Sequence, residues 1–331
     1  MRILFYCPFK FNLKSKFLNQ LGGIETLNIE LAKKLTNFDC DVYLSTYCNE
    51  ITKKNKIINI PINRLDHKKY NFDVIISSNN SKIFNYFKEA KKFLWLHNTL
   101  AIEKSLRKGL LFPILSNHIN AIFVSSYLNR ITSQFYLFKK RQVLSNFLPS
   151  VYEKNKLNFK RKKIFIWSVQ RDKGLYQLLD LWSEKIFTNR KDLKLYIYGI
   201  SKKKFKSKLK YYQSRNIYFF ERVSKHKLRT IYNKSLAMIC LGYDETFCLN
   251  ALEANACGLP IITFGKTALE DFTINNKNGY IVNNFKELGN KILYLSSSKI
   301  NINIIKYCYN YSKKFHLNKI ISKWLKTIKN S

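Results

Sequence analysis

Short apolar segments alternate with amphipathic segments along this chain. In the first half, five apolar segments are predicted to be strands buried on both faces: residues 2–7, 42–46, 73–78, 93–96 and 121–126. Residues 23–35 are predicted to form a helix, because Leu27, Leu31 and Leu35 recur at every fourth position with polar residues opposite. Alternating strands and helices predict a parallel sheet with helices on both sides.

The same alternation starts again after the polar, lysine-rich stretch that ends near residue 163. The second set of predicted strands comprises residues 164–169, 193–199, 217–220, 236–241 and 260–265. The sequence therefore predicts an α/β chain of two Rossmann-like parallel-sheet domains, residues 1–149 and 150–310, which face a central cleft. Residues 311–331 contain a helix whose apolar side, including Leu317, Ile321 and Trp324, is expected to pack back toward the N-terminal domain.

The composition is that of a folded protein of the cytosol. The chain has 331 residues, 46% of them hydrophobic, which excludes general disorder and is enough for two cores. Its seven cysteines are scattered without a C-x-x-C pair, as expected for a reducing compartment. The N-terminus lacks the apolar region of a signal peptide, and polar residues interrupt the uncharged stretch 109–129. We therefore expect a cytoplasmic protein, either soluble or peripheral on the membrane.

A net charge of +38, from 59 basic and 21 acidic residues, leaves two interpretations open. A field of this size attracts any polyanion, so a non-enzymatic polyanion-binding protein is one alternative. Lysine, however, accounts for 48 of the 59 basic residues, as biased codon usage would produce, and lysine runs are usually solvated helix faces. No specific nucleic-acid partner is expected.

Glycine is scarce, with ten residues in all, so each one is informative. Gly22 and Gly23 precede the first predicted helix, where residues without Cβ let an anion approach the helix amides, although a plain turn is an alternative. Arg171 and Lys173 follow the first strand of the second set. Two cations at that end of a strand suit a diphosphate, although a solvated basic turn would look the same.

Two of the few acidic residues, Glu245 and Glu253, lie eight positions apart around the start of a predicted helix. The backbone amides of this helix start are expected to donate to a phosphate; they belong to Phe247, Cys248, Leu249 and Asn250. Two carboxylates can accept hydrogen bonds from sugar hydroxyls, so together these groups suit a nucleotide sugar. The alternative is that acids simply favour the first turns of a helix.

The sequence resembles the family 4 retaining glycosyltransferases of the two-domain GT-B type over nearly its whole length. The residues that carry the resemblance are GGIET (22–26), WLHN (95–98), FVSSYL (123–128), RDKGLYQLL (171–179), the E-x7-E of Glu245 and Glu253, and NGYIV (278–282). The resemblance implies transfer of a sugar, of the hexose class, from a nucleotide-sugar donor with retention of anomeric configuration.

The resemblance also implies roles for individual residues. Glu245 would contact the donor sugar and Glu253 the ribose diol. Arg171 and Lys173 would bind the diphosphate, and Gly23 would lie against the β-phosphate. His97 would border the reaction centre as a second catalytic residue, although a purely structural histidine is an alternative.

Some positions depart from the family pattern. Cys248 stands where the family usually has glycine, so only its backbone amide can be carried over. Arg171 is closer to Lys173 than in many members. Asp39 and Asp41 match the Asp-x-Asp pair of metal-dependent transferases formally, but acids are ordinary residues of the turn expected there. We therefore expect no metal or other cofactor, with the diphosphate stabilised by cations and amides.

The acceptor is expected to be a glycan or a lipid-linked molecule in the assembly of cell-surface polysaccharide or lipopolysaccharide. Residues 103–117 combine Lys104, Arg107 and Lys108 with apolar residues, which suits the anionic cytoplasmic face of an inner membrane, and residues 135–141 are similar. Burial of the apolar residues in the core is the alternative. A sugar-nucleotide epimerase on the same fold is a further alternative. The sequence does not identify the donor's base or sugar.

Overall fold

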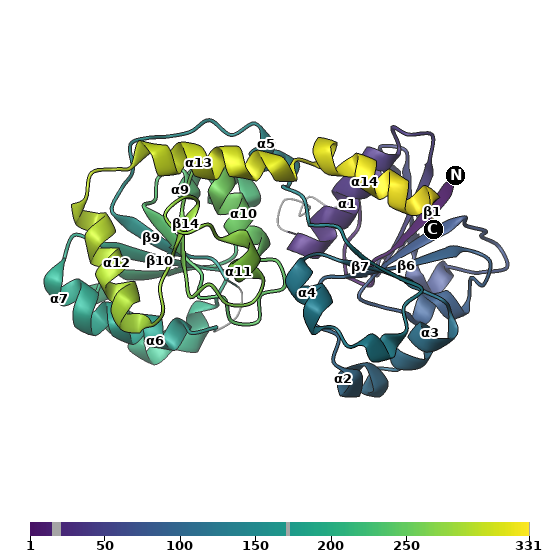
Figure 1. Cartoon of the computed structure of the whole chain (residues 1–331), viewed down its shortest axis with the longest axis horizontal. Coiled ribbons are helices and arrows are strands. Elements are labelled where there is room, and N and C mark those ends of the chain that lie inside the picture. The colour runs from purple at the N-terminus through teal and green to yellow at the C-terminus, as the bar shows by residue number, and fades with distance from the viewer. Residues whose placement is uncertain (15–20, 170–172, 331) are drawn as a thin grey trace. The chain divides into compact units, whose positions relative to one another are not determined.

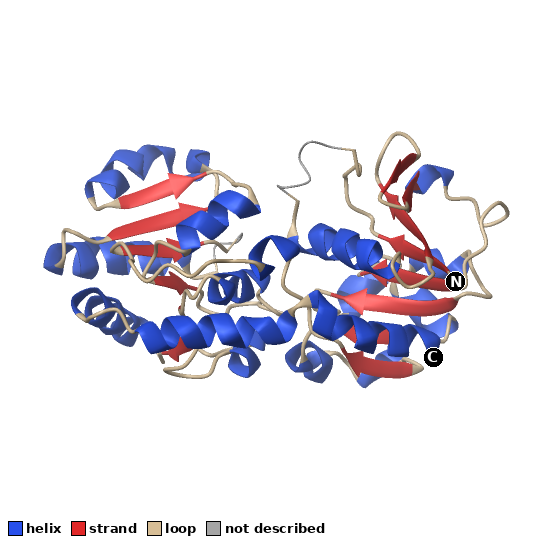
Figure 2. Cartoon of the chain, turned by 90° about the horizontal axis from the view of Figure 1, so that it is seen from above, coloured by secondary structure: helices blue, strands red, loops and turns tan. Residues whose placement is uncertain are grey.

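The computed structural model describes residues 1–14, 21–169 and 173–330. The chain folds as two units: Met1–Pro149 together with Leu317–Ser331, and Ser150–His316. In both units a sheet made largely of parallel strands is flanked by helices (Figures 1 and 2). This is the α/β architecture that the alternating sequence pattern predicts.

The first unit is built on an eight-stranded sheet in the order β3-β4-β2-β1-β5-β6-β7-β8, antiparallel between β3 and β4 and parallel elsewhere. Its strands are β1 (Arg2–Tyr6), β2 (Asp41–Thr46), β3 (Thr52–Lys54), β4 (Ile57–Pro61), β5 (Val74–Ser78), β6 (Lys91–Leu96), β7 (Asn120–Phe123) and β8 (Lys140–Val143). Its helices are α1 (Gly23–Leu35), α2 (Ile102–Arg107), α3 (Leu111–Ser116), α4 (Ser126–Ile131) and α14 (Leu317–Lys329). Short 3₁₀ turns are η2 (Ile62–Arg64), η3 (Lys82–Asn85) and η4 (Gln134–Tyr136).

The central strands of this sheet are the ones that the sequence predicts. β1, β2, β5, β6 and β7 match the expected segments within three residues at each end. The sequence analysis missed β3, β4 and β8, and two of these, β3 and β8, are the edge strands. The sequence of β3 is TKK and that of β8 is KRQV. Charged residues are common on edge strands, where they discourage pairing with other chains, so these strands lack the apolar run used to predict the others.

The C-terminal helix α14 belongs to the first unit, where it packs beside α1 (Figure 1). Trp324 is fully buried and meets Trp95 of β6 edge to face, with ring centroids 4.8 Å apart. Lys91 Nζ also donates a hydrogen bond to the carbonyl of Lys329, at 2.9 Å. Ile320 and Thr327 are buried along with the expected Leu317, Ile321 and Trp324.

The second unit is built on a six-stranded, fully parallel sheet in the order β11-β10-β9-β12-β13-β14. Its strands are β9 (Ile164–Trp167), β10 (Lys194–Tyr198), β11 (Ile217–Phe220), β12 (Ala237–Ile239), β13 (Ile261–Thr263) and β14 (Gly279–Ile281). Its helices are α5 (Ser150–Glu153), α6 (Leu175–Leu181), α7 (Phe187–Asn189), α8 (Leu209–Ser214), α9 (Lys225–Tyr232), α10 (Leu249–Ala256), α11 (Ala268–Phe272), α12 (Phe285–Ser297) and α13 (Ile302–Ser312). A π-helical turn, η5 (Trp182–Ile186), follows α6, and 3₁₀ turns are η6 (Lys202–Lys208) and η7 (Lys313–Phe315).

Each sheet reverses its strand order at one point. In the second unit the chain runs from β9 outward through β10 to β11 and then returns to β12, on the other side of β9. In the first unit the corresponding neighbours are β1 and β5. Open parallel sheets bind ligands at the carboxyl ends of the strands that flank such a reversal. The loops after β9 and β12 are therefore where a site is expected in the second unit.

Two further sequence expectations concern the membrane and the Asp-x-Asp pattern. Among the helices of the described residues, none has the length and apolar content that crossing a bilayer requires. Asp39 adopts a left-handed φ of 54° in the turn after α1, and Asp41 is the first residue of β2; both are exposed.

Candidate functional site

Lys173 and Glu245 come from the two loops that flank the strand reversal of the second unit. Lys173 follows β9 and Glu245 follows β12, and these strands are parallel neighbours. Lys173 Nζ lies 2.5 Å from Glu245 Oε1 and 3.3 Å from the carbonyl oxygen of Asp244. Both side chains are largely shielded, each with 13% of its surface exposed. These two residues are 72 positions apart in the sequence. The fold brings them together, as the sequence analysis expected for residues of one site.

Gly174 allows the loop after β9 to lie close to the loop after β12. It precedes α6 with a φ of 92°, a conformation that residues with Cβ rarely adopt. A Cβ at this position would lie 2.7 Å from Leu241 Cδ1 and 2.9 Å from the ring of Tyr243. The close packing holds Lys173 where it reaches Glu245.

Helix α10 begins at Leu249, two residues after Phe247, the first of the expected amide donors, and Cys248 is its N-cap. Cys248 has φ 61° and ψ 70°, a left-handed conformation that glycine adopts most easily. A glycine, which the resemblance leads us to expect at this position, would adopt this conformation without strain. The thiol is buried, and its hydrogen bond with Cys240, followed by burial itself, raises the pKa of Cys248 well above its ordinary value.

The neighbours of Cys248 fix the helix start to the sheet and to the core. The Asn250 side chain donates to the carbonyl oxygen of Ser168, directly after β9. Phe247 is buried and meets Phe315 edge to face, with ring centroids 6.1 Å apart. Leu249, the first residue of α10, is half-buried. All four predicted amide donors therefore belong to one turn, beside Glu245.

Glu253 lies in α10 and is completely buried. Its Oε2 accepts a hydrogen bond of 3.0 Å from the hydroxyl of Tyr152, and its Oε1 pairs with Lys225 Nζ at the start of α9. Burial, and then the charge of Glu253, raise the pKa of Tyr152 well above its ordinary value, so the phenol is a hydrogen-bond donor. The Lys225 side chain is 18% exposed, so this side of the Glu253 carboxylate lies nearest to solvent.

The sequence analysis missed the two partners of Glu253. Lys225 is one lysine among 48, and Tyr152 lies in a short helix 101 positions before Glu253. The contacts of these two residues with Glu253 form only because the fold brings distant parts of the chain together, so no local sequence pattern indicates them. Arg171, the other predicted diphosphate ligand, lies outside the described residues.

In the first unit, Gly22 and Gly23 lie at the start of α1, after the loop that follows β1. Gly22 is the N-cap and Gly23 the first helical residue. Glu25 folds back over this helix end, so closely that a Cβ on Gly22 would collide with Glu25 Oε2. The position therefore already attracts a carboxylate, as a helix N-terminus does.

His97 follows β6 in the first unit and is buried, 5% exposed. Its backbone N–H donates to Asn79 Oδ1 at 2.7 Å, and its ring lies 4.4 Å from that of Trp95. Burial lowers the pKa of His97 to about 3, so the imidazole is neutral at physiological pH. A small cavity of about 80 Å³ begins beside it, lined by Asn79, Asn98 and Lys104 among others.

Comparison with known proteins finds a family model that matches most of the second unit. Residues 152–315 match the family model "Glycosyl transferases group 1", which spans nearly the whole unit. No curated protein sequence matches the chain.

Solved structures with the same fold include glycosyltransferases. Sucrose-phosphate synthase from Thermosynechococcus elongatus has a TM-score of 0.74 at 16% identity, over 99% of this chain and 98% of that chain. WaaG, a glycosyltransferase involved in lipopolysaccharide biosynthesis, has a TM-score of 0.71 at 14% identity, over 99% and 100%. Anabaena HepE, solved with UDP and glucose, has a TM-score of 0.71 at 14% identity, over 100% of both chains. Most of the second unit therefore matches the model of the glycosyl transferases group 1, and the chain as a whole has the GT-B fold.

Proposed function

We propose that this chain is a retaining, metal-independent glycosyltransferase of family 4, which transfers a hexose-like sugar from a nucleotide-sugar donor. The observation that carries the proposal is the Lys173–Glu245 pair at the strand reversal, next to the first turn of α10. A cation, a carboxylate and helix amides within one site provide complementary groups for a diphosphate and for sugar hydroxyls. The E-x7-E spacing of Glu245 and Glu253 agrees with this use.

In this proposal the second unit binds the donor. Lys173, with Arg171, stabilises the diphosphate, and the amides of residues 247–250 donate to it. Glu245 exchanges its ion pair with Lys173 for hydrogen bonds to the sugar hydroxyls. Glu253 accepts from the ribose diol as Lys225 withdraws. In the first unit, Gly23 approaches the β-phosphate, whose charge replaces that of the Glu25 carboxylate.

The proposed reaction needs no carboxylate nucleophile and no metal. The bond between the anomeric carbon and the phosphate oxygen breaks, and the acceptor oxygen bonds to the same face of the sugar. The acceptor's proton passes to the departing phosphate. Lys173 and the helix amides stabilise the negative charge that develops there. His97 enters this scheme as a neutral hydrogen-bonding group beside the reacting sugar.

The similar structures suggest which substrates to test first. HepE was solved with UDP and glucose, and WaaG is involved in lipopolysaccharide biosynthesis. UDP-sugars are therefore the first donors to test, and precursors of lipopolysaccharide or polysaccharide are the first acceptors. A screen of UDP-, GDP- and ADP-sugars by thermal stabilisation would identify the donor. No stabilisation by any of them would contradict the proposal, and donor consumption that yields only an epimerised sugar would identify an epimerase.

We also propose peripheral attachment to the anionic cytoplasmic face of the inner membrane. Lys104, Arg107 and Lys108 are exposed around α2, and large apolar side chains are exposed beside them on α2 and α3. These apolar residues are Ile102, Leu106, Phe112 (67% exposed) and Leu115. Leu111 and Ile114 are buried, so only part of the expected apolar segment is available.

The 135–141 segment adds Phe135 and Leu137, which are 52% and 77% exposed. Cations beside exposed apolar residues favour anionic bilayers by about 1 kcal/mol per cation.

Flotation with vesicles would test the attachment. The chain should float with anionic vesicles and not with zwitterionic ones, and replacement of Lys104, Arg107 and Lys108 by glutamate should reduce flotation. The same replacement of Lys202, Lys203 and Lys206, in the η6 turn of the second unit, is the matched control. Equal behaviour toward both vesicle types would contradict the proposal.

A further inference from the structure

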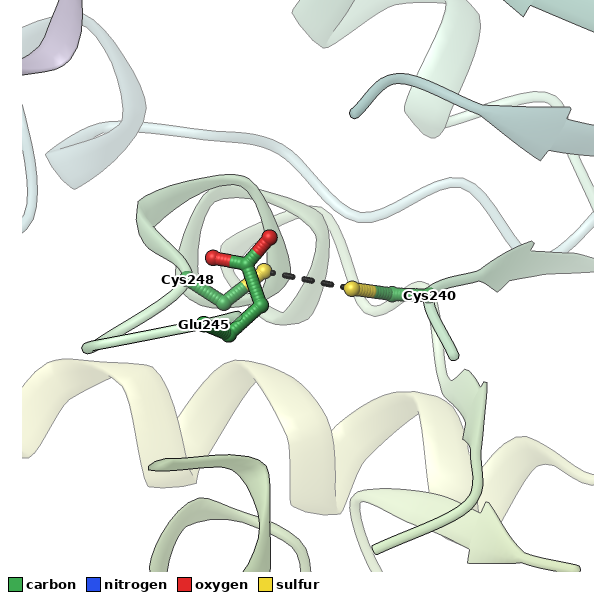
Figure 3. Close-up of side chains that lie close together, drawn as sticks. All are labelled: Cys240, Glu245 and Cys248. Atoms are coloured by element: carbon green, nitrogen blue, oxygen red, sulfur yellow. Dashed lines mark hydrogen bonds between the residues drawn. The ribbon is translucent and has the colours of Figure 1, made fainter. Parts of the chain in front are cut away.

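Cys240, Cys248 and Glu245 bring three metal-ligating side chains together (Figure 3). The two sulfur atoms are 3.4 Å apart, and the sulfurs and one carboxylate oxygen all lie within 4.8 Å of one another. Both thiols are buried, whereas the carboxylate is partly exposed. All seven cysteines are free, so neither sulfur is bound in a disulfide.

The backbone holds each of these residues in place. Cys240 directly follows β12 and donates its N–H to the carbonyl of Ile262, at 2.9 Å. The Cys248 carbonyl accepts from the N–H of Ala251 at 3.0 Å, which fixes the first turn of α10. The Glu245 carbonyl accepts from the N–H of Ala268, at 3.1 Å. The three side chains are therefore positioned by the fold itself.

The spacing is close to that of a tetrahedral metal site. Metal–sulfur bonds to zinc are about 2.3 Å long and metal–oxygen bonds about 2.0–2.2 Å, so two coordinated sulfurs lie about 3.8 Å apart. The two sulfurs are 3.4 Å apart in the structure, so they would have to move only slightly farther apart to bind one metal ion. The carboxylate oxygen has to approach them, which its partly exposed side chain allows.

We infer that Cys240, Cys248 and Glu245 form a binding site for a thiophilic divalent cation of the zinc and cadmium class. Two sulfurs and one carboxylate exclude magnesium and calcium, which require oxygen ligands, and suit zinc or cadmium. Each thiol gives its proton to the solvent as its metal bond forms. The resulting three negative charges are balanced by the divalent cation together with Lys173, whose ammonium group contacts Glu245. Three protein ligands leave the fourth position open.

The bound cation would inhibit sugar transfer, and this part of the inference rests on the proposed function of Glu245. A carboxylate coordinated to a metal is no longer available for the sugar hydroxyls. The cation is therefore an inhibitor at this site rather than a cofactor. Cys240 is not one of the proposed donor-binding residues. Its thiol contacts the thiol of Cys248, of which only the backbone amide belongs to the donor site, so Cys240→Ala removes a metal ligand and keeps every group that binds the donor.

Titration of the reduced, metal-free full chain with Co²⁺ and Cd²⁺ tests the site. Coordination by cysteine produces sulfur-to-metal charge-transfer absorption, and we expect it to saturate near one cation per chain. Cys240→Ala and Cys248→Gly should each lose this absorption, or weaken apparent Co²⁺ affinity by more than about tenfold. Glycine at 248 suits the left-handed backbone, so the second variant keeps the helix start folded. Cys48→Ser, in the first unit, is the matched control and should keep the absorption.

Absence of the absorption in the wild-type chain, or its persistence in both variants, would overturn the site. Zn²⁺ should also inhibit the wild-type enzyme and leave Cys240→Ala active. If the absorption is present and depends on both cysteines but Zn²⁺ does not inhibit, the metal site stands and the role proposed for Glu245 fails.

Discussion

Lys173 Nζ lies 2.5 Å from Glu245 Oε1, so the cation expected at the diphosphate and the carboxylate expected at the sugar are partners in this structure. In this ion pair each side chain balances the charge of the other. Binding of a donor would give the cation a phosphate and free the carboxylate for hydroxyl groups. The pair thus predicts that the two residues respond to the donor together.

Glu245→Gln should lower turnover while nucleotide binding is retained. The substitution removes charge-assisted hydrogen bonds of about 1.5–3 kcal/mol to the reacting sugar, which corresponds to a roughly 10- to 150-fold lower turnover. Steady-state kinetics would measure the loss, and calorimetric titration with the free nucleotide would show that binding persists. Turnover equal to wild type would mean that Glu245 does not contact the sugar.

Glu253→Gln should instead weaken nucleotide binding. Loss of the charge-assisted hydrogen bond to the ribose diol predicts a cost of about 1.5–3 kcal/mol in calorimetric titration. Tyr152→Phe is the matched control, since it removes a partner of Glu253 but keeps the carboxylate, and its effect on binding should be smaller. If the glutamine variant binds the nucleotide like wild type, the ribose role is wrong.

Gly174→Ala should destabilise the second unit and lower activity, whereas Gly199→Ala should cost less. Both glycines have a left-handed φ, 92° and 82°, so both alanines carry a strain of about 1 kcal/mol. Only at Gly174 would the new Cβ also collide with Leu241 and Tyr243, while Gly199 has open space within 4 Å. Denaturant unfolding and activity assays would compare the two variants. Equal losses would show that the packing around Gly174 does not hold the site.

Much of the fold could be predicted from the sequence, because buried parallel strands leave continuous apolar runs. α1 and β11 have the predicted bounds, and the fold confirms the arrangement of two parallel sheets. The strands β3, β8 and β14 were missed, and all three lie at sheet edges, where the apolar signal is weak. The interior strand β4 was missed as well, although it is largely buried. Local patterns carry little information about such positions.

The candidate site could be predicted only in part. The positions of Lys173 and Glu245 follow from their places after β9 and β12, since parallel strands end at a common edge. The Lys225–Glu253 pair could not be predicted, because charge pairing across the fold leaves no spacing pattern. At position 248 the resemblance leads us to expect glycine, and this expectation correctly indicated a left-handed backbone conformation, which Cys248 adopts. The roles of these residues remain predictions.

His97 should make the stability of the first unit depend on pH. Burial lowers its pKa from 6.5 to about 3, so below pH 6.5 the unfolded chain binds a proton that the folded chain does not. Above pH 6.5 the ionisation of His97 therefore does not lower the free energy of unfolding. Below pH 6.5 this free energy falls by up to about 1.4 kcal/mol per pH unit as the pH decreases toward 3. Hydrogen exchange of residues 91–123 at several pH values would follow this loss. His97→Gln should reduce the slope, the exposed His118→Gln should not, and equal slopes in all three chains would contradict the assignment.

The anomeric configuration of the released sugar tests the central claim most directly. With water as acceptor, a retaining transferase slowly hydrolyses its donor, and proton NMR can follow which anomer of the free sugar forms first. For the donor identified by thermal stabilisation, we expect the donor's own configuration to form first, in the presence of EDTA and at a rate lowered by Glu245→Gln. Initial release of the opposite anomer, or a strict requirement for a divalent metal, would contradict the account.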